Sequence, residues 1–115
     1  MTLNIYNDLS HQKEEFQPLD PSQARMYVCG ITPYDETHLG HGRAYVTFDI
    51  VRRYLEYSGY NVKHVQNITD VDDKIIQKGQ AIRGKGQEIA EKYSQAYFEV
   101  MDKLNVKRAD EYPKA

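Results

Sequence analysis

The chain has 115 residues, of which 40% are hydrophobic and 28% are charged, and its formal net charge is −2. This composition is typical of a small globular domain or part of one. It excludes a membrane-spanning helix, because no apolar run approaches the roughly 20 residues that a bilayer requires. It also lacks the basic stripe of nucleic-acid-binding surfaces. The single cysteine, Cys29, excludes an internal disulfide and favours a reducing, cytoplasmic setting.

The first part of the chain predicts an extended segment followed by a buried strand. Residues 1–25 contain short extended pieces and a loop with Pro18 and Pro21. Residues 26–31, Met-Tyr-Val-Cys-Gly-Ile, form a continuous apolar run. Such a run is typical of a strand buried on both faces of a parallel sheet.

A helix and a second strand follow. We expect the helix to begin near Leu39 with Thr37 as its N-cap. Its predicted apolar face is formed by Ala44, Phe48, Val51 and Leu55, with Arg52, Arg53 and Glu56 on the other side. Residues 61–68 then predict a strand. A strand–helix–strand unit forms a parallel crossover, and ligands bind where the strands of such a sheet end, here residues 30–32 and 69–73.

The second half of the chain predicts two more helices and a polar tail. Residues 71–81 favour a helix, and Gly79, Gly84 and Gly86 loosen the chain around Lys85. The predicted apolar face of the last helix consists of Ile89, Tyr93, Tyr97, Val100 and Leu104. The tail, residues 108–115, shows no sign of a completed domain.

The most informative stretch is residues 37–42, Thr-His-Leu-Gly-His-Gly. His38 and His41 lie three apart at a helix start, so their side chains point the same way. The first N–H groups of a helix lack intrahelical partners and carry partial positive charge, and Gly40 lets a ligand approach the backbone. The stretch therefore predicts a phosphate site whose imidazoles can donate to oxygens that gain charge. The alternatives are chance spacing or a metal pair, although the His-Glu-x-x-His pattern is absent.

Two further features admit two interpretations each. Cys29 is either a small apolar residue buried in a strand or one ligand of a zinc site, which needs three or four protein ligands. Residues 69–73, Thr-Asp-Val-Asp-Asp, are a capped helix start with acids in its first turn. They also place Thr69 at the end of a strand, beside the first site. The spacing of an EF-hand calcium loop is missing.

These residues resemble a known family. Residues 26–41, MYVCGITPYDETHLGH, and 67–74, NITDVDDK, are similar to cysteinyl-tRNA synthetases, which are class I aminoacyl-tRNA synthetases. Residues 38–41 are similar to the HIGH signature of that class, with leucine in place of isoleucine. The combination of this signature with residues 29–32 and 69–73 makes the resemblance specific, and it extends along essentially the whole chain.

The resemblance implies an α/β fold, namely a truncated N-terminal half of a Rossmann-like, HIGH-type nucleotide-binding domain with a parallel sheet. It also implies that the full-length enzyme activates cysteine with ATP and magnesium to cysteinyl-adenylate and transfers the cysteine to tRNA(Cys). The implied roles are catalysis for His38 and His41, ATP binding for His38, Gly40 and His41, cysteine binding for Gly30, Thr32 and Thr69, and zinc ligation for Cys29.

The resemblance also predicts a division of the chain. Residues 1–25 would be an N-terminal extended segment, residues 26–83 the front half of the catalytic domain, and residues 84–115 a helix leading into a connecting insertion. A second ATP loop like KMSKS, further zinc ligands and tRNA-binding regions are absent from the sequence. We therefore expect the fragment alone to be inactive, and its half-sheet to self-associate through exposed edges and apolar faces.

Three alternatives remain open from the sequence. The ligase that joins cysteine to a glucosaminyl-inositol in mycothiol synthesis shares nearly all these motifs, although Lys74 and the two isoleucines after it favour a synthetase. The chain could be a folded piece that performs no catalysis. It could also be a small stand-alone nucleotidyltransferase, for which the sequence lacks a second phosphate-binding loop.

Overall fold

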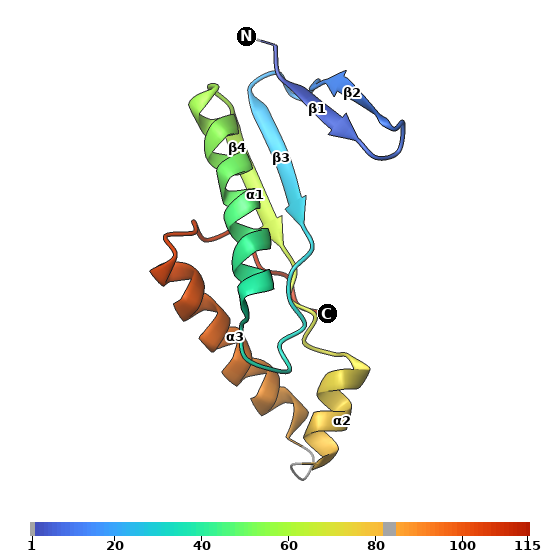
Figure 1. Cartoon of the computed structure of the whole chain (residues 1–115), viewed down its shortest axis with the longest axis vertical. Helices are drawn as coiled ribbons and strands as arrows, with labels where there is room; N and C mark the ends of the chain where they lie inside the picture. The colour runs from blue at the N-terminus through green and yellow to red at the C-terminus, as the bar shows by residue number, and fades with distance from the viewer. Residues whose placement is uncertain (1, 82–84) are drawn as a thin grey trace.

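The computed structural model describes residues 2–81 and 85–115 and contains a hairpin, a parallel sheet and three helices (Figure 1). The hairpin pairs β1 (Asn4–Asn7) with β2 (Gln12–Glu15) in antiparallel fashion. The sheet pairs β3 (Gln23–Val28) with β4 (Asn61–Gln66). The helices are α1 (Leu39–Tyr57), α2 (Asp73–Ala81) and α3 (Gly86–Lys103). Figure 1 shows the hairpin at one end of the molecule and α2 at the other. None of the described helices is long and apolar enough to cross a membrane.

The predicted parallel strand–helix–strand unit is confirmed. Strands β3 and β4 run parallel, in a register that places Gln23 opposite Asn61 and Val28 opposite Gln66. Helix α1 connects them and lies in front of the sheet in Figure 1. The α/β class predicted from the sequence is therefore confirmed.

The expectation that β3 is buried on both faces is wrong. Ala24 and Val28 are buried, but Tyr27, between them in the alternation, is 66% exposed. The strand begins three residues earlier than predicted and ends before Cys29. The physical reason is that α1 and α3 pack on the same face, where Val28 shares a core cluster with Tyr45 of α1 and Tyr97 of α3.

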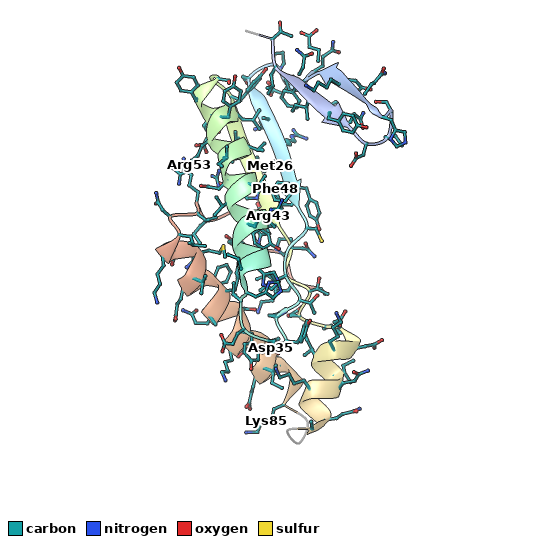
Figure 2. All side chains as sticks on the ribbon, viewed as in Figure 1. Met26, Asp35, Arg43, Phe48, Arg53 and Lys85 are labelled. Atoms are coloured by element: carbon teal, nitrogen blue, oxygen red, sulfur yellow. The ribbon has the colours of Figure 1, made fainter. Side chains whose placement is uncertain are left out.

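The predicted apolar face of α1 is also largely wrong. Phe48 and Val51 are each 40% exposed, whereas Asp49 and Arg52 are buried. Of the predicted face, only Leu55 is buried. Figure 2 shows Phe48 on α1, and Arg53 on the side of that helix nearer the C-terminal segment. The helix is thus rotated so that part of its charged side faces inward.

The inward charged side of α1 holds the main chain that follows α3. The Asp49 carboxylate accepts a hydrogen bond from the Lys107 N–H at 3.0 Å. Arg52 donates to the Arg108 carbonyl at 2.6 Å, and Arg53 to the Asn105 carbonyl at 2.7 Å. Three charged side chains of one helix therefore fix three main-chain groups within four residues. Asp49 and Arg52 are buried, and buried charges are tolerated where they are paired in this way.

The contacts of Asp49, Arg52 and Arg53 with the main chain of residues 105–108, which we call the clamp, direct the tail back to the sheet. The Gln66 N–H donates to the Glu111 carbonyl at 3.1 Å, and the Ile68 N–H to the Pro113 carbonyl at 2.9 Å. Bridges between Val65 and Glu111 and between Ile68 and Lys114 are parallel. The tail, which the sequence presents only as a polar stretch, therefore adds a third parallel segment beside β4.

The two later helices follow the sequence closely. Helix α2 begins two residues after the predicted start. The residues of α3 that are buried are Ile89, Ala90, Tyr97 and Met101, so the predicted face is correct at Ile89 and Tyr97 and wrong at Leu104, which is 48% exposed. Gly84, which we expected to loosen the chain, lies outside the described residues.

The ends of β3 and β4 approach each other closely at Gly30. The Gly30 N–H donates to the Asn67 side-chain oxygen at 2.7 Å. A Cβ placed on Gly30 would lie 1.5 Å from the Asn67 carbonyl oxygen. Because the obstacle is backbone, a side chain fits there only if the two strand ends move apart.

We therefore expect Gly30→Ala to lower the free energy of unfolding by at least the roughly 1–3 kcal/mol of an overpacked core. Gly42→Ala is the control, because a Cβ there meets only Leu104 at an ordinary 3.5 Å. In a helix interior that change is expected to stabilise by up to about 1 kcal/mol. Urea denaturation followed by circular dichroism measures both. Equal effects in the two variants would contradict the close approach.

A buried histidine lies at the clamp. His64 of β4 is 5% exposed, and its Nδ1 lies 3.4 Å from Arg52 Nη1. Its Nε2 is buried without a hydrogen-bond partner among the described residues. Burial lowers the pKa of His64 and the Arg52 charge lowers it further, against smaller opposing effects of Asp110 and Asp49. The neutral ring is therefore the form that fits the folded chain.

The lowered pKa of His64 predicts a loss of stability in mild acid. The unfolded chain binds the proton more readily than the folded chain, so the contribution of His64 is present above its ordinary pKa of 6.5 and is lost as the pH falls below it. We expect His64→Gln to flatten the dependence of the unfolding free energy on pH between about 7 and 5. His11→Asn, at an exposed position in the hairpin, is the control and should leave that dependence unchanged.

Candidate functional site

The first turn of α1 is built around two stacked histidines. His38 is the N-cap, and its Nδ1 accepts a hydrogen bond from the Gly40 N–H at 3.1 Å. His41 reaches back, and its Nδ1 accepts from the His38 N–H at 3.3 Å. The two rings stack with their centroids 3.8 Å apart and an angle of 17° between their planes. The expectation that these side chains point the same way is confirmed.

The cap determines where each neutral ring carries its proton. Because a backbone N–H donates to each Nδ1, that nitrogen is unprotonated and the proton resides on Nε2. Burial lowers the pKa of His41, and the neighbouring His38 lowers it further. The lowered pKa favours the neutral form of His41, and both rings keep their Nε2 side directed away from the capping hydrogen bonds.

The structure corrects two expectations about this turn. The N-cap is His38 and not Thr37, although the helix does begin at Leu39 as predicted. The first N–H groups are also less available than expected, because the Gly40 N–H already donates to His38 and the His41 N–H to the His38 carbonyl at 3.0 Å. An anion would thus meet imidazole donors more than bare backbone.

Glycine is favoured at position 40 for a structural reason, in addition to the predicted close approach of a ligand. A Cβ at this position would lie 2.9 Å from the His38 ring carbon Cε1. A side chain would therefore push the imidazole out of its capping position. Glycine here allows the His38 ring to fold over the helix start.

The strand ends place the remaining candidate residues. Cys29 and Gly30 directly follow β3, and Thr69 lies three residues after the end of β4. The Thr69 N–H donates to the Ile31 carbonyl at 3.0 Å, which joins the two strand ends. Thr32 is half-buried in the same connection. The structure therefore brings Gly30, Thr32 and Thr69 to one edge of the sheet.

Cys29 is exposed, which overturns the interpretation of a small apolar residue buried in a strand. Its thiol lies beyond the end of β3, and its Sγ is 3.9 Å from the Gly30 carbonyl oxygen. Within residues 2–81 and 85–115, no three His, Cys, Asp or Glu side chains gather where they could hold a metal ion. A zinc site needs three or four protein ligands, and the described residues place no such group around this thiol.

Sequence reasoning missed two residues at this edge. Asn67 holds the Gly30 amide through its side chain. Tyr45 donates its hydroxyl to the Cys29 carbonyl at 3.1 Å. Tyr45 follows His41 by four residues, so helical spacing could have placed it on the same side of α1. The sequence carries no comparable signal for Asn67.

The comparisons with known proteins agree with this architecture. Residues 15–115 match the family described as tRNA synthetases class I (C) catalytic domain. Over all 115 residues the chain is 57% identical to the cysteine–tRNA ligase of Gloeobacter violaceus and 50% identical to that of Gloeothece citriformis. It spans 24% of each of these relatives, about a quarter of their length. These relatives do not favour the alternative of a mycothiol-type cysteine ligase.

Solved structures show the same fold at low identity. A methionyl-tRNA synthetase of Mycobacterium tuberculosis bound by methionyl-adenylate superposes with a TM-score of 0.72 at 18% identity, covering 80% of this chain and 18% of that one. A second structure of such a synthetase with methionyl-adenylate gives 0.67 at 21% identity, covering 76% and 18%. The family match, which covers most of the chain, shows that it belongs to the class I tRNA synthetases, in the family of the (C) catalytic domain.

Proposed function

We propose that this chain supplies the front part of the ATP site of a cysteine–tRNA ligase. In the proposed reaction a carboxylate oxygen of cysteine attacks the α-phosphorus of magnesium-bound ATP. Cysteinyl-adenylate forms and pyrophosphate leaves. The cysteinyl group then passes to the 3′ end of tRNA(Cys), and AMP is released. The names of the relatives support this substrate and this acceptor.

The observation that carries the proposal is the histidine cap. His38 and His41 hold their Nδ1 atoms on backbone N–H groups and leave their Nε2–H groups as donors. Donors fixed before the reaction stabilise charge that develops on phosphate oxygens, because they need no rearrangement. The partial positive charge of the helix start acts in the same direction. We therefore assign ATP binding and catalysis to His38 and His41, and ATP binding also to Gly40, whose lack of a side chain keeps the cap closed.

We assign the cysteine pocket to Gly30, Thr32 and Thr69. These residues lie at the carboxyl ends of parallel strands, which is where ligands of such sheets bind. The Thr69–Ile31 hydrogen bond supports a single pocket rather than two separate surfaces. A hydroxyl or a backbone group there can hold the amino or carboxylate group of the substrate.

Zinc remains a prediction that rests on Cys29. An exposed thiol can become a thiolate ligand, and zinc would select cysteine over serine through its preference for sulfur. The described residues bring no group of three such ligands together, so a complete zinc site would need further ligands beyond those that gather here. No step of the proposed chemistry is routed through the metal.

The partners and the division of the chain also remain proposals. Because the chain has a net charge of −2 and no basic stripe, we assign the tRNA(Cys) contacts to regions outside this chain. We place the ligase in the cytoplasm. The domain boundaries at 25/26 and 83/84 stay predictions, and the second lies outside the described residues. Self-association is tested by light scattering at high concentration, where a monomeric mass would count against it.

A chimera tests the proposed function. This chain replaces the matching quarter of the Gloeobacter violaceus ligase, with which it is 57% identical. We expect cysteine-dependent ATP–pyrophosphate exchange and charging of tRNA(Cys), and no reaction with serine. The 115-residue chain by itself is expected to be silent. A folded chimera, verified by circular dichroism, that exchanges no pyrophosphate with cysteine would contradict the proposal.

The chimera also tests the role of His38. His38→Asn keeps a good N-cap, since asparagine caps helices well, but it removes the Nε2–H donor. We expect turnover to fall by about 10²–10³, as when one donor to a developing charge is lost, with little change in melting temperature. His11→Asn in the hairpin is the control. Unchanged turnover in His38→Asn would remove His38 from the catalytic assignment.

A further inference from the structure

The peptide group between Cys29 and Gly30 is held at both of its polar atoms. Its carbonyl oxygen, from Cys29, accepts a hydrogen bond from the Tyr45 hydroxyl at 3.1 Å. Its N–H, from Gly30, donates to the Asn67 side-chain oxygen at 2.7 Å. A peptide group is planar. Two hydrogen bonds on its opposite sides therefore fix the orientation of the Cys29–Gly30 peptide relative to α1 and to Asn67.

Tyr45 belongs to the element that carries the histidine cap. It lies on α1 four residues after His41 and is 7% exposed. Its ring packs edge-to-face on Tyr97 of α3, with centroids 5.3 Å apart and an interplanar angle of 77°. Tyr97 is in turn held by the Gln66 side chain, which donates to its hydroxyl at 2.7 Å. The Tyr45 ring therefore has a fixed position from which its hydroxyl reaches across to β3.

We propose that Tyr45 is a positioning residue that fixes the end of β3 against the histidine end of α1. The Cys29 carbonyl lies beyond the last residue of β3, where the pairing of β3 with β4 no longer holds the chain. The Asn67 side chain holds the N–H side of this peptide, and the Tyr45 hydroxyl supplies the restraint on its carbonyl side. In this way one side chain sets the spacing between the ATP side and the cysteine side of the site. The use of this restraint in positioning the substrates rests on the proposed function, whereas the hydrogen bond itself is present without a ligand.

The chemistry of the phenol suits a permanent restraint. Burial raises the pKa of Tyr45 to about 12. The hydroxyl therefore stays protonated, and so stays a donor, at neutral and moderately alkaline pH. The reacting groups of two bound substrates must be held in a narrow geometry, and a donor that does not titrate holds that geometry at every working pH.

Amide hydrogen exchange on the ligand-free chain tests the restraint. Tyr45→Phe keeps the ring and removes the hydroxyl. Tyr97→Phe is the matched control, because it removes one buried hydroxyl from the same aromatic pair without touching Cys29. After correction for global stability, we expect the Gly30 amide to exchange about fivefold faster in Tyr45→Phe than in Tyr97→Phe, the factor of about one net hydrogen bond. Equal exchange in the two variants would overturn the proposal.

A second variant separates the donor from general damage to the fold. Replacing Tyr45 by 4-aminophenylalanine restores an N–H donor at the same place, and we expect it to return Gly30 protection toward that of the natural chain. Failure to do so, in a folded variant, would also overturn the proposal.

The same substitution in the chimera connects the restraint to the site. We expect Tyr45→Phe to raise the KM for cysteine by about fivefold and to leave the KM for ATP unchanged, a split that simple loss of folded protein does not produce. A rise in neither KM, or an equal rise in both, would contradict the positioning role. Because the exchange experiment uses no substrate, a silent chimera would refute the proposed function without deciding whether Tyr45 restrains the peptide.

Discussion

The rotation of α1 about its own axis is the constraint on which the rest of the structure depends. It is set by two charged side chains, Asp49 and Arg52, that turn inward and bond the backbone after α3. Buried charges of this kind are stable only when their partners are in place, so helix and tail hold each other. The same rotation directs Tyr45 into the core and leaves Phe48 half-exposed. One helix thus organises the third parallel segment, the core and the candidate site.

The candidate site lies where the start of α1 comes next to the ends of β3 and β4. The histidine cap stabilises α1 and, by the same hydrogen bonds, leaves two Nε2–H groups free to donate. Gly40 and Gly30 serve it by the absence of a side chain, one under an imidazole and the other against the Asn67 carbonyl. Folding and proposed chemistry therefore use the same atoms. A substitution at either glycine disturbs the geometry of the site before it affects any contact with substrate.

The sequence allowed much of this to be predicted, but with a clear limit. The parallel unit, the start of α1 at Leu39 and the common direction of His38 and His41 followed from local patterns, whereas the stacking of the two rings did not. The buried face of α1 did not, because periodicity assigns the apolar side to the core and cannot foresee that Asp49 and Arg52 find partners more than 50 residues away. The prediction that β3 is buried on both faces was wrong for a related reason, because the apolar pattern of the strand does not show which layers cover the sheet.

What the sequence determined by itself is the order of elements and the family, because these depend on short motifs and local periodicity, and the assignment of site residues stays a prediction from the same motifs. What only the tertiary structure decided is how those residues are held. The docking of the tail beside β4 and the hydrogen bond from Tyr45 to the Cys29 carbonyl both join segments that are distant in the chain. Such contacts are selected by the satisfaction of buried polar groups in three dimensions, which no local pattern records.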